Sequence, residues 1–124
     1  MFFVRKLNEF HIDNTIIHMF YRSTLLSVIS FCLTAWGGNV HSSYANKFNT
    51  LFKKISKITK MTPDTFSSLF KSCCHHKLLS IMKDESHPLF HQIKYSSRSG
   101  RILHLKANRE RYKNSFMPSA IRDC

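Results

Sequence analysis

The sequence predicts an all-α protein, and two observations support this. Two long stretches, residues 15–39 and about 42–60, place apolar residues at steps of three and four, the period of one helix face. Only a short loop separates them, and a short loop between two long helices favours an antiparallel arrangement. We therefore expect a long antiparallel helical hairpin, followed by two short helices and a basic, largely irregular C-terminal tail.

Residues 1–10 are expected to form a short helix with Phe3, Leu7 and Phe10 on one side. Two phenylalanines follow the first methionine directly, and nothing caps the start of this helix. We therefore expect a helix that begins before this chain does, and hence a fragment. The segment does not resemble a signal peptide, because charged residues follow its short apolar run closely.

The segment of residues 15–39 is the longest apolar stretch in the chain. Asp13 and Asn14 offer side chains that can cap a helix start, and Gly37-Gly38 tolerates the left-handed conformation of a helix end. A helix that is apolar on two faces is expected to pack on both sides. The two expected stripes are Ile17, Tyr21, Leu25, Val28, Cys32 and Trp36, and beside it Ile16, Phe20, Ile29 and Leu33.

The same segment has to be weighed as a membrane span, which takes about 20 apolar residues. Arg22 lies within it, and an arginine near the middle of a bilayer costs about 2.5 kcal/mol or more. The part that follows Arg22 is too short to span alone. We expect a soluble core helix, and the alternative is a small membrane-associated helical protein with residues 15–36 embedded.

The second long helix, about residues 42–60, combines an apolar stripe with a basic outer face. Lys53, Lys54 and Lys57 on that outer face are candidate nucleic-acid-binding residues, since they could follow a phosphate backbone. A solvated helix face has the same composition. The expected apolar stripe is Tyr44, Phe48, Leu51, Phe52, Ile55 and Ile58.

Two shorter helices are expected next, one with Phe66, Leu69 and Phe70 and another over residues 73–83. The run Cys-Cys-His-His at 73–76 raises the question of zinc. Zinc sites want two ligand pairs, each separated by two to four residues, and no second pair follows. We expect helix packing here and no metal site. A His-Pro step at 87–88 breaks the helical pattern, so we divide the chain into residues 1–90 and 91–124.

The tail of residues 91–124 interleaves basic residues with aromatic ones. This composition suits a polynucleotide, because Arg and Lys meet phosphate while rings stack on bases. A basic tail that docks on its own core would have the same composition. The candidate nucleic-acid-binding residues in the tail are Arg98, Arg101, Arg109, Arg111, Tyr112 and Lys113.

Charge is the strongest functional signal in the composition. The chain has 19 Lys and Arg against 7 Asp and Glu, a net charge of +12. A charge of this sign favours RNA or DNA as a partner, bound electrostatically and without sequence preference. Exposed apolar helix faces predict self-association as well.

The sequence contains few residue patterns that are typical of an active site. The carboxylates do not converge as two-metal chemistry requires, no glycine-rich phosphate loop occurs, and no pattern marks a nucleophile with its base. We expect no enzyme activity, no cofactor and no small-molecule substrate. The four cysteines show no disulfide spacing, so we expect an intracellular protein of the nucleus or cytoplasm that is not secreted.

Several motifs occur together in an order typical of one family. They are FYRSTLLSVISFCLTAWGGN at 20–39, SHPLF at 86–90, SGR at 99–101 and RYKNSFMPSAIR at 111–122. From about residue 4 to residue 122 the chain resembles the C-terminal segment of reverse transcriptase-like proteins from non-LTR (LINE-type) retrotransposons. Corresponding segments there are of the type FYxSxIESVLTxxxxxWxGN and SHPLxxxxxxLPSGRRYRVPxxRTNRYRNSFIPxAIRLLN.

The resemblance implies a region downstream of a polymerase palm, in a parent protein that is an RNA-directed DNA polymerase. The palm's paired metal-binding aspartates are absent from this sequence, so the segment is expected to be non-catalytic. The chain also departs from the family pattern. Leu26 stands where the family has Glu, and SRSGRILHLK at 97–106 lacks an aromatic and both prolines of the family's LPSGRRYRVP. A decayed or partial copy, including a non-functional relic of a retroelement, is therefore a further alternative.

Overall fold

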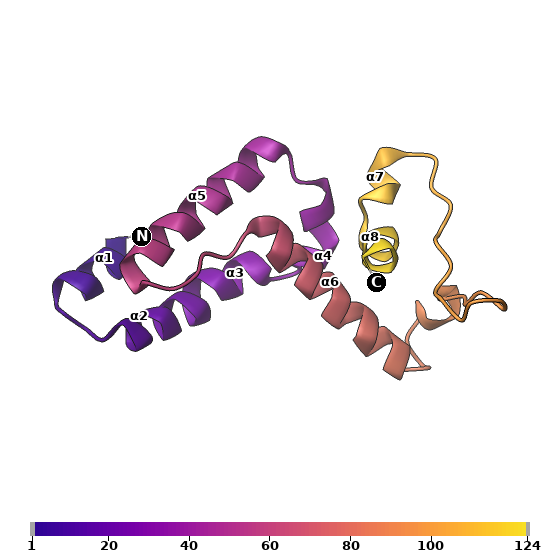
Figure 1. Ribbon diagram of the computed structural model, residues 1–124, viewed down its shortest axis with the longest axis horizontal. Coiled ribbons are helices and arrows are strands. Elements are labelled where there is room, and N and C mark those ends of the chain that lie inside the picture. Colours follow the sequence, from indigo (N-terminus) through magenta and orange to yellow (C-terminus); the bar gives the residue numbers. More distant parts are fainter. Residues whose placement is uncertain (1, 124) are drawn as a thin grey trace. The chain divides into compact units, whose positions relative to one another are not determined.

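The computed structural model describes residues 2–123, and the all-α prediction is confirmed (Figure 1). Within those residues no strand occurs, and the pairing outside helices is an isolated antiparallel bridge between Tyr95 and Ile102. The helices are α1 (Phe2–Glu9), α2 (Asn14–Tyr21), α3 (Ser27–Ser30), α4 (Leu33–Trp36), α5 (Ser42–Thr59), α6 (Phe66–Lys83), α7 (Glu110–Lys113) and α8 (Phe116–Arg122). The other helical turns are a π-helical turn, η1 (Arg22–Leu26), and two 3-10 turns, η2 (Gly37–Asn39) and η3 (Phe90–Gln92).

The chain divides into two compact units. The first comprises Met1–Phe31 with Val40–Leu69, and the second comprises Cys32–Asn39 with Phe70–Cys124. Helix α6 therefore begins in the first unit and continues in the second. The division at residue 90, which follows composition, stays a prediction.

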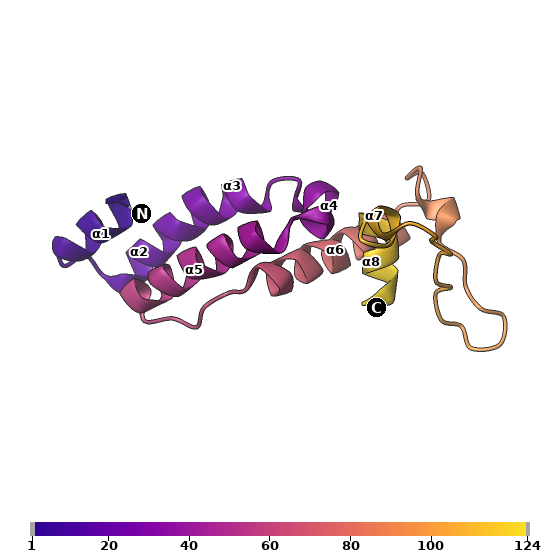
Figure 2. The ribbon, with the colours of Figure 1, turned by 90° about the horizontal axis from the view of Figure 1, so that it is seen from above.

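Helices α1, α2 and α5 form the core of the first unit. Both α1 and α2 pack against α5, and α2 and α5 run in opposite directions (Figure 2). Their buried apolar side chains are Val4, Ile17, Tyr21, Phe52 and Ile55, each no more than 4% exposed. Burial and the nearby carboxylate of Asp64 raise the pKa of Tyr21 to about 12.

The start of α6 is fixed against α5. The rings of Phe48 and Phe66 stack with centroids 5.3 Å apart, and the Phe66 backbone N–H donates to the Asn49 side-chain oxygen at 2.8 Å. This bond satisfies one of the amide groups that a helix start leaves without an intrahelical partner. α5 itself ends at Lys60, whose φ of 56° is in the left-handed region.

The expected single helix over residues 15–36 is wrong in its second half. Phe31 has an extended ψ of 119° and Cys32 a left-handed φ of 49°, so the helix stops at Ser30 and restarts at Leu33. From this region on only the second expected stripe is buried, since Val28 of the first stripe is 74% exposed while Ile29 of the second is buried. The side chain of Asp13 does not cap α2, although its backbone position is the N-cap.

The physical reason for the shifted stripe is the π-helical turn η1. In an α-helix, residues four apart are rotated about 40° relative to one another around the helix axis. The π-helical turn has more residues per turn and cancels this rotation, so Tyr21 and Ile29, on either side of it, are buried on the same side. Ser and Thr hydroxyls also fold back on carbonyls along this stretch, which loosens a helix. These bonds run from Ser23 and Thr24 to Phe20, from Ser27 to Ser23 and Thr24, and from Ser30 to Ser27.

The buried face of the first helix also differs from the prediction. Phe3 and Phe10 are 68% and 73% exposed, whereas Val4 is 1% exposed and is the buried residue of α1. Phe3 and Val4 are neighbours in sequence, so a shift of one position moved the expected face. The prediction was wrong because the size of a side chain does not decide which side of a short helix faces a core.

In the second unit α6 packs with α8. Cys74, Leu78 and Ala120 form a buried cluster, against which Phe70, Met82, Ile93, Ile102 and Phe116 pack. α6 ends at Lys83, where Asp84 accepts hydrogen bonds from the Ser86 hydroxyl at 2.5 Å and the Ser86 N–H at 3.0 Å. These bonds lower the pKa of the Asp84 carboxyl.

One prediction for the second half of the chain is wrong. The two short helices expected at 66–70 and 73–83 are one helix, α6, because no Gly or Pro interrupts residues 66–83 and helix propagation is cooperative. The apolar residues of α6 do not form a single stripe, because Phe66 is buried in the first unit and Leu78 in the second.

The tail is not irregular throughout. α8 follows Ser115, and Met117 to Ile121 are all buried. Pro118 lies in the first turn of α8, where a missing N–H costs little. The prediction for the tail was based on its basic residues and missed this apolar run, which belongs to the core of the second unit.

No single helix within residues 2–123 is both long and apolar enough to cross a membrane. Residues 14–30 and 33–39 satisfy the length and composition of a span only when they are taken together across the break.

Candidate nucleic-acid interface

Helix α5 brings Lys53, Lys54 and Lys57 together on its outer side, as the sequence predicts from their spacing. All three side chains are exposed. The helix presents them because Phe52, Ile55 and Thr59 point into the core of the first unit and leave the opposite side to solvent. Lys47 and Lys60 are exposed as well and extend the basic side in both directions.

No acidic residue offsets these charges nearby in the sequence. The stretch Ser42–Thr59 contains no Asp or Glu, and within residues 2–123 none of the ion pairs involves a lysine of α5. Lys53 and Lys57 are four residues apart, and like charges at that spacing destabilise a helix by about 0.2–0.5 kcal/mol. A polyanion would relieve this repulsion on binding.

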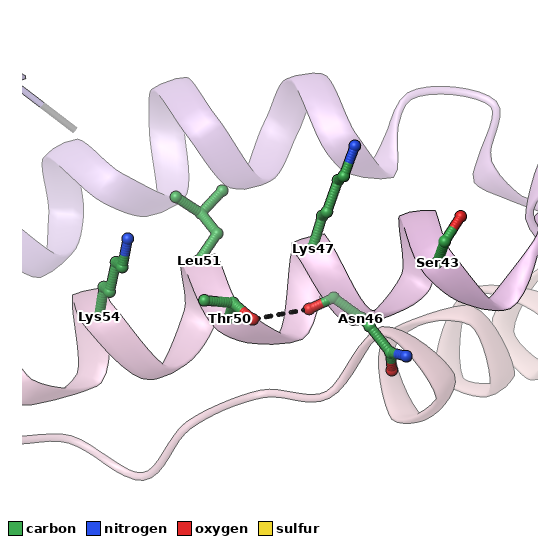
Figure 3. Close-up of a pocket in the computed structure, with 6 residues that line it drawn as sticks. All are labelled: Ser43, Asn46, Lys47, Thr50, Leu51 and Lys54. Carbon is green, nitrogen blue, oxygen red and sulfur yellow. Dashed lines mark hydrogen bonds between the residues drawn. The ribbon is translucent and has the colours of Figure 1, made fainter.

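A groove of about 410 Å³ follows the same helix. Figure 3 shows Lys47 and Lys54 projecting to one side of α5 with Leu51 between them. The ammonium group of Lys47 lies 5.1 Å from the centre of the Tyr44 ring, a cation–π contact that restricts it. The remaining lining residues are Ser43, Asn46 and Thr50, and the Thr50 hydroxyl donates to the Asn46 carbonyl at 2.9 Å.

Lys47 and Lys60 extend this surface beyond the predicted set. The signal was present, because Lys47 precedes Lys54 by seven residues, which is two turns of a helix on one face. Ser43, Asn46 and Thr50 give no comparable signal, since small polar residues on an exposed helix side are common.

The remaining predicted residues belong to the second unit. Arg98 and Arg101 are exposed in the loop that contains the Tyr95–Ile102 bridge. The Ser96 N–H donates to the Arg101 carbonyl at 2.8 Å, which fixes the backbone of Arg101. Gly100 turns this loop with a φ of 65°, a conformation that glycine adopts without strain.

Arg109, Arg111, Tyr112 and Lys113 are at or within α7. Arg109 is the N-cap residue, and the Asn39 side chain donates to the Arg111 carbonyl at 3.3 Å. Tyr112 is 45% exposed, and an exposed aromatic ring is a group on which a base can stack. Lys113 is a weaker candidate than the sequence suggests, because its ammonium group lies 2.7 Å from the Glu110 carboxylate.

The Cys-Cys-His-His run lies within α6. Within residues 2–123 no group of three or more His, Cys, Asp or Glu residues is placed to hold a metal ion. Cys74 is instead part of the core cluster of the second unit, and burial raises the pKa of its thiol to about 11. Burial raises the pKa of Cys73 as well.

Comparison with protein-family models, with curated proteins and with solved structures found no match for this chain. The resemblance to reverse transcriptase-like proteins therefore stays a hypothesis based on the motifs named above. The candidate interface is based on the geometry of α5 and on the exposed cations of the second unit.

Proposed function

We propose that this chain is a non-catalytic nucleic-acid-binding segment of a reverse transcriptase-like protein, and that α5 provides its contacts to the phosphate backbone. The observation that carries the proposal is the outer side of α5, where exposed lysines follow one another without an acidic partner among the described residues. The motif resemblance supports the same role, because it places the segment next to a polymerase palm.

The spacing of the α5 lysines suits a repeating anion. At a rise of about 1.5 Å per residue, Lys47 and Lys54 are separated by about 10 Å along the helix axis. A single strand whose bases stay stacked advances about 3.4 Å per nucleotide, as one strand of a duplex does, so this distance corresponds to about three nucleotides. Lys53 and Lys57 add charge on the adjoining side of the helix. Such contacts carry affinity and no sequence preference.

The second unit offers a complementary feature. Tyr112 presents a partly exposed ring between Arg111 and Lys113, and aromatic stacking contributes about 1–3 kcal/mol per base in proteins that bind single strands. We therefore propose single-stranded RNA or DNA as the ligand.

The test compares two triple variants in binding to a fluorescently labelled, single-stranded 20-nucleotide RNA at 50 mM salt. The variant K53Q/K54Q/K57Q removes the central cations of α5. The control variant K6Q/K77Q/K83Q removes the same charge from exposed helix positions elsewhere. Glutamine keeps a straight side chain and a similar helix propensity. We expect the α5 variant to bind about tenfold or more weakly, with the control variant close to wild type.

Equal losses in the two triple variants would show that net charge alone binds the RNA, and would overturn the assignment to α5. Circular dichroism of both variants checks that helix content is unchanged.

Membrane association is the second candidate function. Its supporting observation is that apolar side chains of α2 and α3 are exposed, with Ile16 at 55%, Met19 at 64% and Val28 at 74%. Residues 14–39 also pass the composition test for a span when the break is ignored. Carbonate extraction of the expressed chain tests this alternative, and release into the soluble fraction would contradict it.

A further inference from the structure

A cavity of about 450 Å³ lies in the second unit, between the loop at residues 100–104 and the end of α8. Its volume is within the range of small-molecule sites. Basic side chains dominate its polar lining, and none of the lining residues is acidic. The lining residues are Gly100, Arg101, Ile102, His104, Ile121 and Arg122.

The fold holds both walls in place. Ile102 packs against the buried cluster of Cys74, Leu78 and Ala120, which fixes the loop to the core. The Leu103 N–H donates to the Lys94 carbonyl at 2.7 Å, and this bond closes the loop next to its bridge. On the other wall Ile121 is 3% exposed and anchors the last turn of α8.

The charges of this cavity are not neutralised within residues 2–123. None of Arg101, His104 and Arg122 forms an ion pair there. The carboxylate closest in sequence, Asp123, lies 3.5 Å from the Lys71 ammonium group. A basic residue at the last turn of a helix favours the helix dipole, which would explain Arg122 alone. It does not explain why Arg101 and His104 line the same cavity.

We propose that this cavity binds a phosphate monoester. Two guanidinium groups match a phosphate because each presents a planar fork of N–H donors to its oxygens. A monoester carries about −1.5 to −2 charge at pH 7, which suits two arginines better than the single charge of a backbone diester. Ile102, which is partly exposed, adds an apolar surface on which the organic part of the ligand packs.

Two sources could provide this group, a 5′-phosphate at the end of a polynucleotide and a free nucleoside monophosphate. The site is independent of the α5 lysines, because the cavity is made entirely by the second unit. Its failure would leave the proposed function of α5 intact, and the reverse also holds.

The experiment measures binding of the full chain to two pairs of probes. One pair is an octanucleotide of oligo-uridine with and without a 5′-phosphate, and the other is uridine 5′-monophosphate and uridine. The variant R101Q/R122Q removes both guanidinium groups of the cavity. The control K77Q/K83Q removes two exposed cations of the same unit that neither line the cavity nor belong to the candidate nucleic-acid interface.

For wild type and for K77Q/K83Q we expect the phosphorylated member of at least one pair to bind about tenfold tighter, and for R101Q/R122Q we expect a ratio near one. A preference confined to the octanucleotide identifies the chain terminus as the source, and a preference confined to the monophosphate identifies the free nucleotide. No preference in wild type, or a preference that survives in R101Q/R122Q, would overturn the proposal. If the wild-type chain bound neither octanucleotide but still preferred the monophosphate over uridine, the cavity proposal would stand and the proposed function of α5 would be contradicted.

Discussion

Gly38 lies where the turn η2 meets the backbone of Asn114. A Cβ at this position would be 1.7 Å from the Asn114 carbonyl oxygen and 3.2 Å from the Phe70 ring. The first contact is with backbone, which cannot rotate away as a long side chain can. The sequence alone predicts glycine here as a helix stop, whereas the structure requires it for close approach of two chain segments.

We predict that Gly38→Ala lowers the free energy of unfolding by about 1–3 kcal/mol, since overpacking forces the backbone to shift. Urea denaturation followed by circular dichroism measures this. Gly100→Asn is the control, because no atom lies within 4 Å of a Cβ there and asparagine tolerates its positive φ. Equal stability of Gly38→Ala and wild type would show that η2 and Asn114 do not approach as described.

Cys74 illustrates how burial acts on a titrating group. Its side chain is 2% exposed, and the pKa of its thiol rises from 9.0 to about 11 mainly because burial disfavours the thiolate. The folded state therefore holds this proton more tightly than the unfolded state does. Stability from this group is fully present below pH 9 and is lost as the pH rises towards 11.

The corresponding prediction is that the urea midpoint falls between pH 9 and pH 10.5, and that the fall is smaller in Cys74→Ala. The comparison uses the slope with pH, because the alanine variant also loses packing and is less stable at every pH. Identical slopes in the two proteins would show that the Cys74 thiol is not the group responsible.

At the scale of elements, periodicity predicted correctly the helix whose buried residues all lie in one core. The bounds of α5, Ser42–Thr59, match the expected 42–60, and its buried residues Phe52, Ile55 and Thr59 all belong to the first unit, although Tyr44 of the expected stripe is 59% exposed. Residues 15–36 and α6 depart from the prediction for the opposite reason. The π-helical turn and the break at Cys32 change the buried side in one case, and α6 contributes to two units in the other.

Cys32→Gly distinguishes a broken helix from a continuous one. In the structure Cys32 has a left-handed φ, so glycine there should stabilise the protein or leave it unchanged, by up to about 1 kcal/mol. In a continuous helix the same substitution would destabilise by about 0.3 kcal/mol, the difference between the helix propensities of Cys and Gly. The sign of the change in the free energy of unfolding, measured with urea, distinguishes the two cases. Cys32→Val is strained at positive φ and should be less stable than wild type and Cys32→Gly.

The candidate interface could be predicted from sequence only in part. Helical spacing placed Lys53, Lys54 and Lys57 on one side of α5, and those positions are exposed as expected. The Glu110–Lys113 ion pair is a spacing of three and could have been found in the same way. The grouping of Arg101 with Arg122 could not, because it depends on how the loop at residues 100–104 packs beside α8.

At the scale of the whole molecule, charge is the feature that packing does not explain. The net charge is +12, and both units contain more basic than acidic residues. Self-repulsion of this size opposes a compact state and is relieved by a polyanion. The predicted self-association, to be checked by size-exclusion chromatography, would arise from exposed apolar side chains such as Met19 and Val28.

Salt dependence is the most direct measurement of the central claim that the basic surface of this chain binds nucleic acid. Affinity of the full chain for single-stranded RNA is measured from 50 to 300 mM potassium chloride. If the three central lysines of α5 each neutralise a phosphate, the logarithm of affinity falls linearly with the logarithm of salt concentration. In K53Q/K54Q/K57Q that slope becomes shallower by about two. Weak binding at the lowest salt, or an affinity that does not change with salt, would contradict the account.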